Sequence, residues 1–456
     1  MWMAVVTGPS PGEAADMRAM VRRRVRSSRI VRPGVLAVTG MLAALAVACG
    51  GGQGEGVREV LVDYQDDEVA SSFLLYFPSN VTVHPGDEVV FRQEWTGEPH
   101  SVTMGTLVDD MMGVVRPLMD QWLEVPEDEV PPEVFEQFEA AMAPLPWMMG
   151  DEGTVQQNGA QPCYLDEGGP PEDPATPCSD EQQEQPAFDG RQSYYNSGYI
   201  HYEGPQGNEF RVPLAEDIEP GVYNYYCNLH SPSMGGTITV AEPDEEIPSQ
   251  EDVARQARAE IEEVAQPLRE AFAELTETSD GEAEVEGRSV PKPLAGFYEQ
   301  SIGHAIISEF IPRRIEIPAG DAVTWHFVGP HTVSFDVPEY FAQITVADDG
   351  TVEFNPQAIE PVNSPGAPEE EGPPEGEEGG EGGAAPSPEE AAPPEEGVPP
   401  DEEETVVVDA GEWHGEGFIS SGMFFSHAYR LTFTQPGTYP YACLIHPQMV
   451  GEVVVR

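Results

Sequence analysis

One set of metal-binding residue types occurs twice in this chain at nearly the same spacing. The sets are Cys227, His230 and Met234 in the first half and Cys443, His446 and Met449 in the second. The same string, Pro-Gly-x-Tyr-x-Tyr-x, precedes both cysteines, and a single Pro-His step lies upstream of each set, ending at His100 and at His331. A cysteine, two histidines and a methionine are ligands that hold copper for electron transfer. The repeat therefore predicts two copper sites.

The residues before each cysteine explain how the ligands converge. In an extended strand, residues two apart share a face, so Tyr223, Tyr225 and Cys227 point the same way. The cysteine ends the strand, a tight loop returns His230 and Met234 to the same point, and the upstream histidine comes from a different loop. A Cys-His-His plane with a weak methionine ligand suits a metal that changes oxidation state with little movement. This arrangement favours an electron carrier over an enzyme.

Strand signals surround both ligand sets. The pattern Pro-x-x-apolar-x-apolar-x-x-Gly-Asp begins at Pro78 and again at Pro312, and alternating apolar residues follow each methionine. Alternation with period two predicts strands, and Gly-Asp and Pro-Gly predict turns. We expect an all-β chain with two antiparallel Greek-key β-sandwiches, a first domain at 57–242 and a second at 291–456.

Each predicted domain carries an insertion, and a linker separates the two. The first insertion covers about 105–189, with a helical stretch near Val130 to Met149. The second, at about 361–404, is almost pure Pro, Glu, Gly and Ala, which predicts disorder. In the acidic linker at 243–290, Ser249 and Asp252 form a capping-box pattern for a helix that reaches about Leu275. We expect Pro267 to kink or split this helix. We interpret the helix as a spacer, although its Val, Ile, Leu and Phe residues could instead pack on a domain.

Both repeats resemble the cupredoxins, the type 1 blue copper domains of plastocyanin and amicyanin. The resemblance is carried by Gly-Pro-His-Thr-Val-Ser-Phe at 329–335 and by Cys-Leu-Ile-His-Pro-Gln-Met at 443–449, which has the short amicyanin-like loop. It implies two type 1 copper ions. The implied equatorial ligands are His100, Cys227 and His230 in the first site and His331, Cys443 and His446 in the second, with Met234 and Met449 axial. In the first repeat the His–Met spacing lies between the amicyanin and plastocyanin loops.

The N-terminus has the character of a targeting signal. The segment from Arg22 to Arg32 is rich in arginine, and the apolar run from Val35 to Ala48 is too short to span a membrane. The run ends in Leu-Ala-Val-Ala-Cys, which resembles a bacterial lipoprotein signal over 1–49 and implies lipidation of Cys49. The alternatives are a cleaved secretory signal and an uncleaved anchor. In each case the protein works outside the cytoplasmic membrane, either anchored by lipid in the cell envelope or secreted.

Two further cysteines, Cys163 and Cys178, lie in a Gly/Pro-rich loop of the first insertion. In an oxidising compartment they are expected to form a disulfide. Metal binding by this pair remains the alternative, although no histidine lies near it in the sequence.

The charge of the chain limits its partners. The net charge is −61, and residues 1–49 hold seven Arg and two acidic residues, leaving 80 acids against 14 basic residues, a charge of −66. Such a protein repels nucleic acid and anionic lipid surfaces, so we expect membrane contact only through the anchor. The excess negative charge either keeps the protein soluble or steers it towards a basic redox donor or acceptor protein.

Three functions follow from these features. The first is an envelope-anchored blue copper protein that carries single electrons through two sites. The second is copper storage or delivery, supported by methionines around the first insertion: Met104, Met111, Met112, Met119, Met142, Met148 and Met149. The third is a two-domain copper oxidase or nitrite reductase. It is disfavoured because the chain has no His-x-His pair, and no histidine flanks Cys227 or Cys443.

Overall fold

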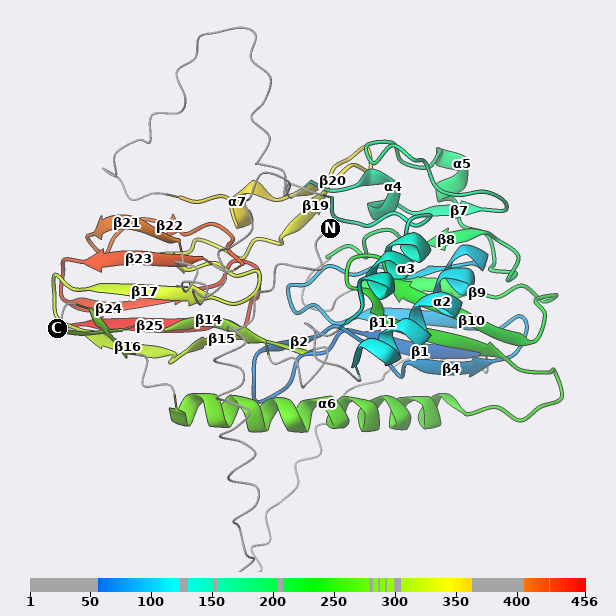
Figure 1. Ribbon diagram of the computed structural model, residues 1–456, viewed down its shortest axis with the longest axis horizontal. Helices are drawn as coiled ribbons and strands as arrows, with labels where there is room; N and C mark the ends of the chain where they lie inside the picture. The colour runs from blue at the N-terminus through cyan, green and yellow to red at the C-terminus, as the bar shows by residue number, and fades with distance from the viewer. Residues whose placement is uncertain are drawn as a thin grey trace, which may run out of the picture.

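The computed structural model describes residues 56–123, 130–150, 154–202, 208–278, 282–285, 288–291, 293–298, 305–362, 406–425 and 427–456. Most of its elements are β-strands, and they form two β-sandwiches side by side (Figure 1). The first half of the chain builds one sandwich, and residues from 294 onward build most of the other. The expected all-β fold class is confirmed. Residues 1–49 with Cys49, and 363–404 of the second insertion, lie outside the described residues.

Two sheets form the first sandwich. One has the order β3 (Tyr76–Phe77), β1 (Val57–Val62), β5 (Glu88–Gln93) and β9 (Asn208–Pro213). The other has the order β4 (Asn80–Val83), β11 (Ser231–Val240), β10 (Gly221–Cys227), β6 (Thr103–Met104), β8 (Tyr194–Asn196) and β7 (Cys163–Leu165). The expected antiparallel pairing is incomplete, because β1 with β5 and β11 with β4 are parallel. Apolar side chains from both sheets fill the space between them.

The second sandwich repeats this plan. One sheet has the order β2 (Ser71–Phe73), β15 (Ala305–Ile311), β14 (Leu294–Tyr298), β17 (Ala322–Phe327), β23 (Ala428–Phe433) and β21 (Val407–Trp413). The other has the order β16 (Arg314–Ile317), β25 (Val450–Val455), β24 (Gly437–Ala442), β18 (Ser334–Phe335) and β22 (Ile419–Ser420). Two small hairpins, β12 (Glu282–Val285) with β13 (Arg288–Pro291) and β19 (Ile344–Val346) with β20 (Val352–Phe354), and helix α7 (Pro356–Ile359) complete this half.

One strand crosses the expected domain boundary. Strand β2 comes from the first repeat but pairs antiparallel with β15 of the second sandwich, with Phe73 opposite Ala305. Beside it, the backbone N–H of Ala70 donates to Glu309 Oε1 at 3.0 Å. The boundaries at 242 and 291 therefore do not separate the two sandwiches, because the second one takes an edge strand from the first repeat.

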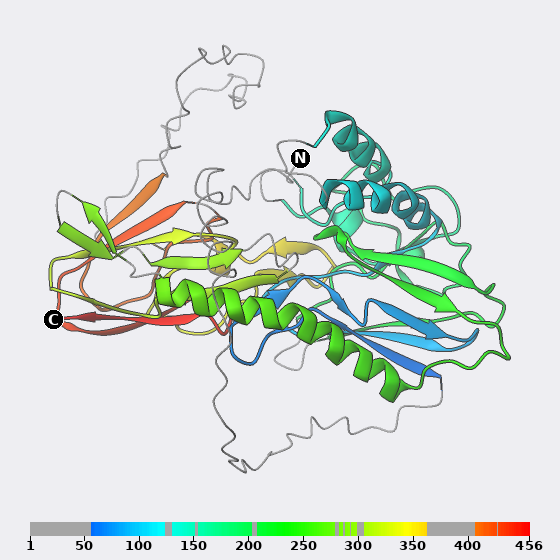
Figure 2. The ribbon, with the colours of Figure 1, turned by 60° about the horizontal axis from the view of Figure 1, so that its bottom comes forward.

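The linker helix is a structural part of both halves. The Ser249–Asp252 cap forms, and α6 (Gln250–Thr278) begins there. It runs through Pro267 as one helix, so the expected split does not occur. Its apolar stripe packs on strands of both sandwiches, with Ala257, Ile261, Ala265 and Leu268 in one cluster with residues such as Phe77 and Ile307. Figure 2 shows the helix lying across both. The helix is therefore not a spacer; the alternative, that its apolar residues pack on a domain, is what the structure shows.

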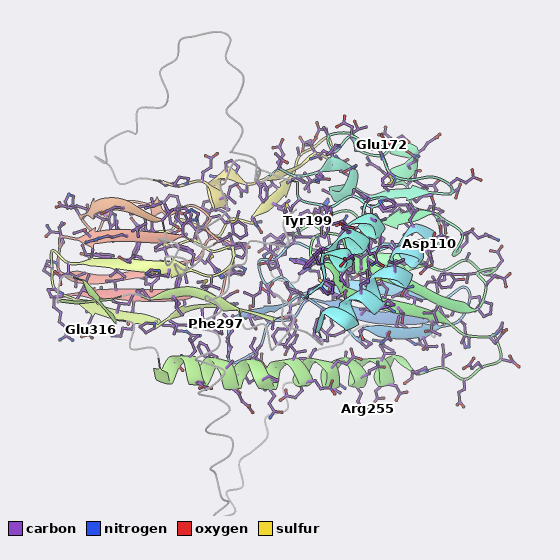
Figure 3. All side chains as sticks on the ribbon, in the orientation of Figure 1. Asp110, Glu172, Tyr199, Arg255, Phe297 and Glu316 are labelled. Carbon is purple, nitrogen blue, oxygen red and sulfur yellow. A yellow bond between two sulfur atoms is a disulfide. The ribbon has the colours of Figure 1, made fainter. Side chains whose placement is uncertain are left out.

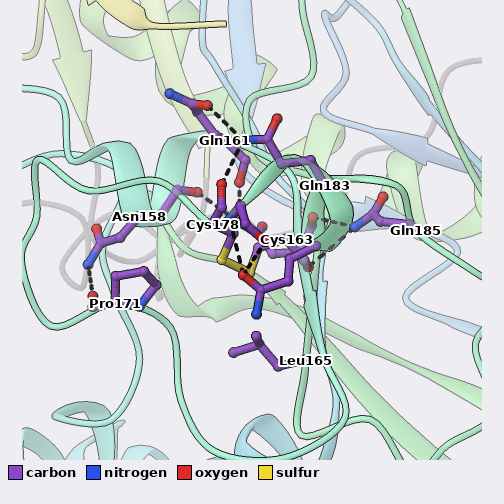
Figure 4. The surroundings of a disulfide bond; sticks show 12 residues. Asn158, Gln161, Cys163, Leu165, Pro171, Cys178, Gln183 and Gln185 are labelled. Carbon is purple, nitrogen blue, oxygen red and sulfur yellow. Dashed lines mark hydrogen bonds between the residues drawn. A yellow bond between two sulfur atoms is a disulfide. The ribbon is translucent and has the colours of Figure 1, made fainter.

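The first insertion is an ordered layer on the first sandwich. Its helices are α2 (Thr106–Leu123), α3 (Pro132–Met142), α4 (Gln157–Ala160) and α5 (Asp180–Gln183). Helix α3 is shorter than the expected stretch, and α2 was not expected. The structure joins Cys163 to Cys178 by a disulfide (Figure 4), buried with α2 and α3 side chains against Tyr194 and Tyr226. No helix among the described residues is long and apolar enough to cross a membrane.

Two candidate metal centres

The first centre lies at one end of the first sandwich, where β10 turns into β11. Cys227 ends β10 at an irregular step in the strand pairing, and Ser231 adopts a left-handed backbone with φ 67° to complete the turn. His230 Nδ1 thereby lies 3.6 Å from Cys227 Sγ. The loop between β5 and β6 brings His100, whose ring centre is 4.8 Å from that of His230. The three predicted ligands converge, with donor atoms within 4.8 Å of one another.

The second centre has the same geometry. His446 Nδ1 lies 3.6 Å from Cys443 Sγ, the same separation as in the first centre. His331 comes from the segment between β17 and β18, and its Nδ1 is 3.1 Å from His446 Nδ1. The two rings are 4.7 Å apart. The three predicted ligands again lie within 4.8 Å of one another.

These donor sets fit a metal such as copper. Separations of 3.1 and 3.6 Å between donors are what one ion with bonds of about 2.0–2.3 Å to nitrogen and sulfur produces. In the first centre, the buried Nδ1 of His100 has no hydrogen-bond partner among the described residues, which leaves its lone pair for an ion. Thiolate sulfur with imidazole nitrogen is a donor set that copper prefers.

The surroundings favour the thiolate form of both cysteines. Burial alone would raise the pKa of the Cys227 thiol, but the neighbouring His100 and His230 rings lower it well below its usual range. His331 and His446 lower the pKa of Cys443 in the same way against its burial. Because a thiolate is the form that binds metals, both sites are prepared electrostatically for a cation.

Both predicted axial methionines are buried in the cores that hold the cysteines. Met234 is fully buried in the core cluster that contains Cys227, and Met449 in the cluster that contains Cys443. Met449 also closes its loop, since its N–H donates to His446 O and its carbonyl accepts from Cys443 N–H, both at 3.0 Å. Each methionine therefore belongs to the same buried core as its cysteine.

Asp63 supports the first centre and was not anticipated from the sequence. This fully buried carboxylate accepts a hydrogen bond of 2.9 Å from His100 Nε2. Its other bonds come from the backbone N–H groups of Tyr64 and Phe73 and from the hydroxyl of Thr96. A carboxylate on the outer nitrogen of a ligand histidine fixes the ring and makes it a stronger donor. The first centre therefore has a negatively charged support.

In the second centre, the histidine from the upstream loop has no such support among the described residues. His331 Nε2 is buried and has no hydrogen-bond partner among the described residues. Instead, two backbone N–H groups approach the sulfur of Cys443, from Thr332 at 3.4 Å and from His446 at 3.5 Å. At Cys227 the corresponding donor is the Ser101 hydroxyl, at a longer 3.9 Å. The two centres share their ligands but differ in their surroundings.

Glu98 contacts both centres. Its Oε1 lies 3.1 Å from His446 Nε2 and its Oε2 lies 3.7 Å from His230 Nε2. Burial would raise the pKa of Glu98, but the two histidines lower it well below its usual range. Glu98 was not predicted from the sequence, although one signal was present. The repeats read Gly-Glu-Pro-His before His100 and Val-Gly-Pro-His before His331, so a carboxylate stands where the second repeat has Gly329.

The loop that carries Glu98 is held firmly against the second sandwich. Trp95 Nε1 donates to the Tyr340 hydroxyl at 2.7 Å, and that hydroxyl donates to Ile445 O at 2.9 Å. Gly97 has a φ of 117°, and a Cβ there would lie 2.4 Å from Ile445 O. Tyr199, labelled in Figure 3, belongs to the apolar cluster that Trp95 shares with Ile344 and Val352. The two centres therefore meet across a packed interface.

The methionines of the first insertion do not form a third site. They are divided among separate hydrophobic clusters: Met104 in the core of the first sandwich, Met111, Met112 and Met142 under the helices, and Met148 at the interface. Methionine commonly fills such irregular gaps. These side chains serve packing in three places.

Comparisons with known proteins add little to this geometry. No family model and no curated protein matches the chain. Among solved structures it is similar to a reduced tryptophan-to-tyrosine mutant of amicyanin, with 18% identity, a TM-score of 0.17 and coverage of 40% of this chain and 89% of that one. Amicyanin from Paracoccus versutus gives 16% identity, a TM-score of 0.15 and coverage of 39% and 94%. At these TM-scores the likeness carries no weight beyond the geometry itself.

Proposed function

We propose that this protein is a two-site blue copper protein that carries single electrons in the cell envelope. The observation that carries the proposal is the pair of equivalent Cys-His-His clusters, each with a cysteine–histidine separation of 3.6 Å and a buried methionine. Copper bound there would supply the cuprous–cupric couple. The residues of the chain hold the thiolate, orient the imidazoles and exclude water.

The burial of the ligands supports electron transfer over substrate chemistry. Seven of the eight side chains are at most 3% exposed: His100, Cys227, Met234, His331, Cys443, His446 and Met449. The eighth, His230, has a side chain that is 14% exposed. A substrate needs an accessible open position on the metal, whereas an electron needs only a short path through the protein. Attachment to a membrane through Cys49, and basic donor and acceptor proteins, belong to the proposal as well.

Copper counting and spectroscopy of the copper-loaded protein test the proposal. We expect two copper ions per chain, intense blue thiolate-to-copper absorption, and reversible reduction and reoxidation. Cys227→Ser and Cys443→Ser should each remove one blue copper and leave the other, because each cysteine belongs to one cluster only. A colourless copper protein, or copper that does not cycle between its two oxidation states, would contradict the proposal. Copper loss to an acceptor protein during cycling would favour delivery instead.

A further inference from the structure

A continuous series of contacts joins the two centres. In each C-terminal ligand histidine, Nδ1 faces the cysteine sulfur at 3.6 Å and Nε2 faces Glu98. The series runs from Cys227 through His230, the carboxylate of Glu98 and His446 to Cys443. Neighbouring groups in this series are at most 3.7 Å apart, so no large gap interrupts the series.

Water has little access to this series. The side chain of Glu98 is 6% exposed and that of His446 is 1% exposed, while that of His230 is 14% exposed. The edge of His446 that would face solvent in an isolated second sandwich is covered by the loop with Trp95 and Gly97. Of the eight ligands, His230 is thus the one whose side chain reaches solvent. An electron from solvent or from a partner protein therefore reaches the second centre by way of the first.

The surroundings give the two centres different affinities for an electron. Asp63 places a negative charge against His100, and this stabilises the oxidised, more positive metal in the first centre. In the second centre, the N–H groups of Thr332 and His446 stabilise negative charge on Cys443 sulfur, which favours the reduced metal. Glu98 adds a carboxylate to both centres and lies closer to His446, at 3.1 Å, than to His230, at 3.7 Å. The first centre still has two carboxylates against its histidines and the second has one, so we expect the second centre to have the higher reduction potential.

We infer that the two centres form an internal relay, in which an electron that enters at the first centre passes to the second through His230, Glu98 and His446. This inference rests on the proposed function. One electron is lost at the first centre and gained at the second, no covalent bond forms or breaks, and Glu98 keeps its contacts with both histidines. The protein can then hold two electrons that arrive one at a time.

The decisive variant is Glu98→Gln in the full copper-loaded chain. The amide keeps the size of the side chain but loses the charge, and its –NH₂ group cannot accept a hydrogen bond from histidine. The matched control is Glu94→Gln, which removes a carboxylate from the same loop without a contact to any ligand. After pulsed reduction of the oxidised protein, we follow electron redistribution between the centres by the absorption of each one. The single-site Cys227→Ser and Cys443→Ser variants provide the reference spectra and potentials.

We expect a first-order redistribution towards the second centre whose rate does not depend on protein concentration. Glu98→Gln should slow it by about tenfold, the scale of effect for groups that orient metal ligands, and Glu94→Gln should leave it unchanged. A rate that rises with protein concentration would overturn the relay and leave the proposed function intact. So would an unchanged rate in Glu98→Gln with both blue coppers present. A protein without blue copper would remove both ideas together.

Measurements on the metal-free protein check the bridge independently of electron transfer. Nitrogen NMR of the histidines should show that Glu98→Gln shifts the Nε2 resonances of both His230 and His446. The resonances of His100 should stay in place, because its ring bonds to Asp63 and not to Glu98. Shifts confined to one of the two bridged rings would show that Glu98 serves only one centre and would overturn the relay.

Discussion

Replacing Asp63 by Asn tests whether charge in the surroundings sets the two potentials apart. Asp63 Oδ2 is 2.9 Å from His100 Nε2, so across the imidazole ring and a metal–nitrogen bond of about 2.0 Å its charge lies roughly 7 Å from the bound metal. A unit charge at roughly 7 Å in an effective dielectric constant of about 20 contributes roughly 2.4 kcal/mol. Because about 1.4 kcal/mol corresponds to about 59 mV for one electron, the expected shift is about 100 mV.

The expected change in reduction potential has a definite sign and is confined to the first centre. Removing the negative charge destabilises the cupric state, so Asp63→Asn should raise the potential of the first centre and leave that of the second unchanged. The assay is a spectroelectrochemical titration of the blue absorption in a Cys443→Ser background, where only the first centre is blue. The asparagine oxygen can still accept from the backbone N–H groups of Tyr64 and Phe73, which preserves the turn.

Asp66→Asn is the matched control for this substitution. Asp66 is also buried, accepts from the backbone N–H groups of Glu68 and Val69, and pairs with Arg269 of helix α6. Asp66 has no contact with a ligand histidine, so Asp66→Asn should leave the reduction potentials of both centres unchanged. An unchanged first centre in Asp63→Asn, or an equal shift in both centres, would refute the reasoning, provided that thermal unfolding shows a folded protein.

Two further substitutions examine the interface loop. Gly97→Ala should lower the free energy of unfolding by about 1–3 kcal/mol more than Gly320→Ala. Both glycines have positive φ, but only a Cβ at position 97 meets the backbone of Ile445. Equal losses in the two variants would argue against this close approach. Glu94 exposes part of its surface, yet burial around its carboxyl group and the charge of Asp63 raise its pKa to about 7. A raised carboxyl pKa stabilises the fold at low pH, and this contribution is lost as pH rises through 7. Urea unfolding at several pH values should show that loss in the unaltered protein and not in Glu94→Gln.

The ligands could be predicted because each is part of a local pattern. A strand that ends in cysteine, followed by a short loop with histidine and methionine, places three donors near one point wherever the rest of the chain goes. The second occurrence of this pattern removed most of the ambiguity. The same reasoning identified the cap of α6 at Ser249, since a capping box is a contact between residues three apart in sequence.

The supports of the ligands could not be predicted because they are contacts between distant parts of the chain. Asp63 is 37 residues from His100, and Glu98 is 348 residues from His446. In a chain with 82 acidic residues, nothing local separates these two carboxylates from the rest. Helix α2 was hidden for a different reason, since Pro117 within it argues against a helix and only packing on the first sandwich overrides that preference.

The pairing of β2 with β15 has a consequence for anyone who wishes to divide this protein. A fragment that begins after α6 would lack the strand that covers β15, and would expose its backbone groups together with apolar residues such as Ile307 and Ile311. Uncovered edges of this kind recruit other chains, so such a fragment should aggregate. In contrast, a chain cleaved once after α6 should stay together as two tightly associated pieces. The sequence pattern occurs twice, but the two sandwiches fold as a single unit.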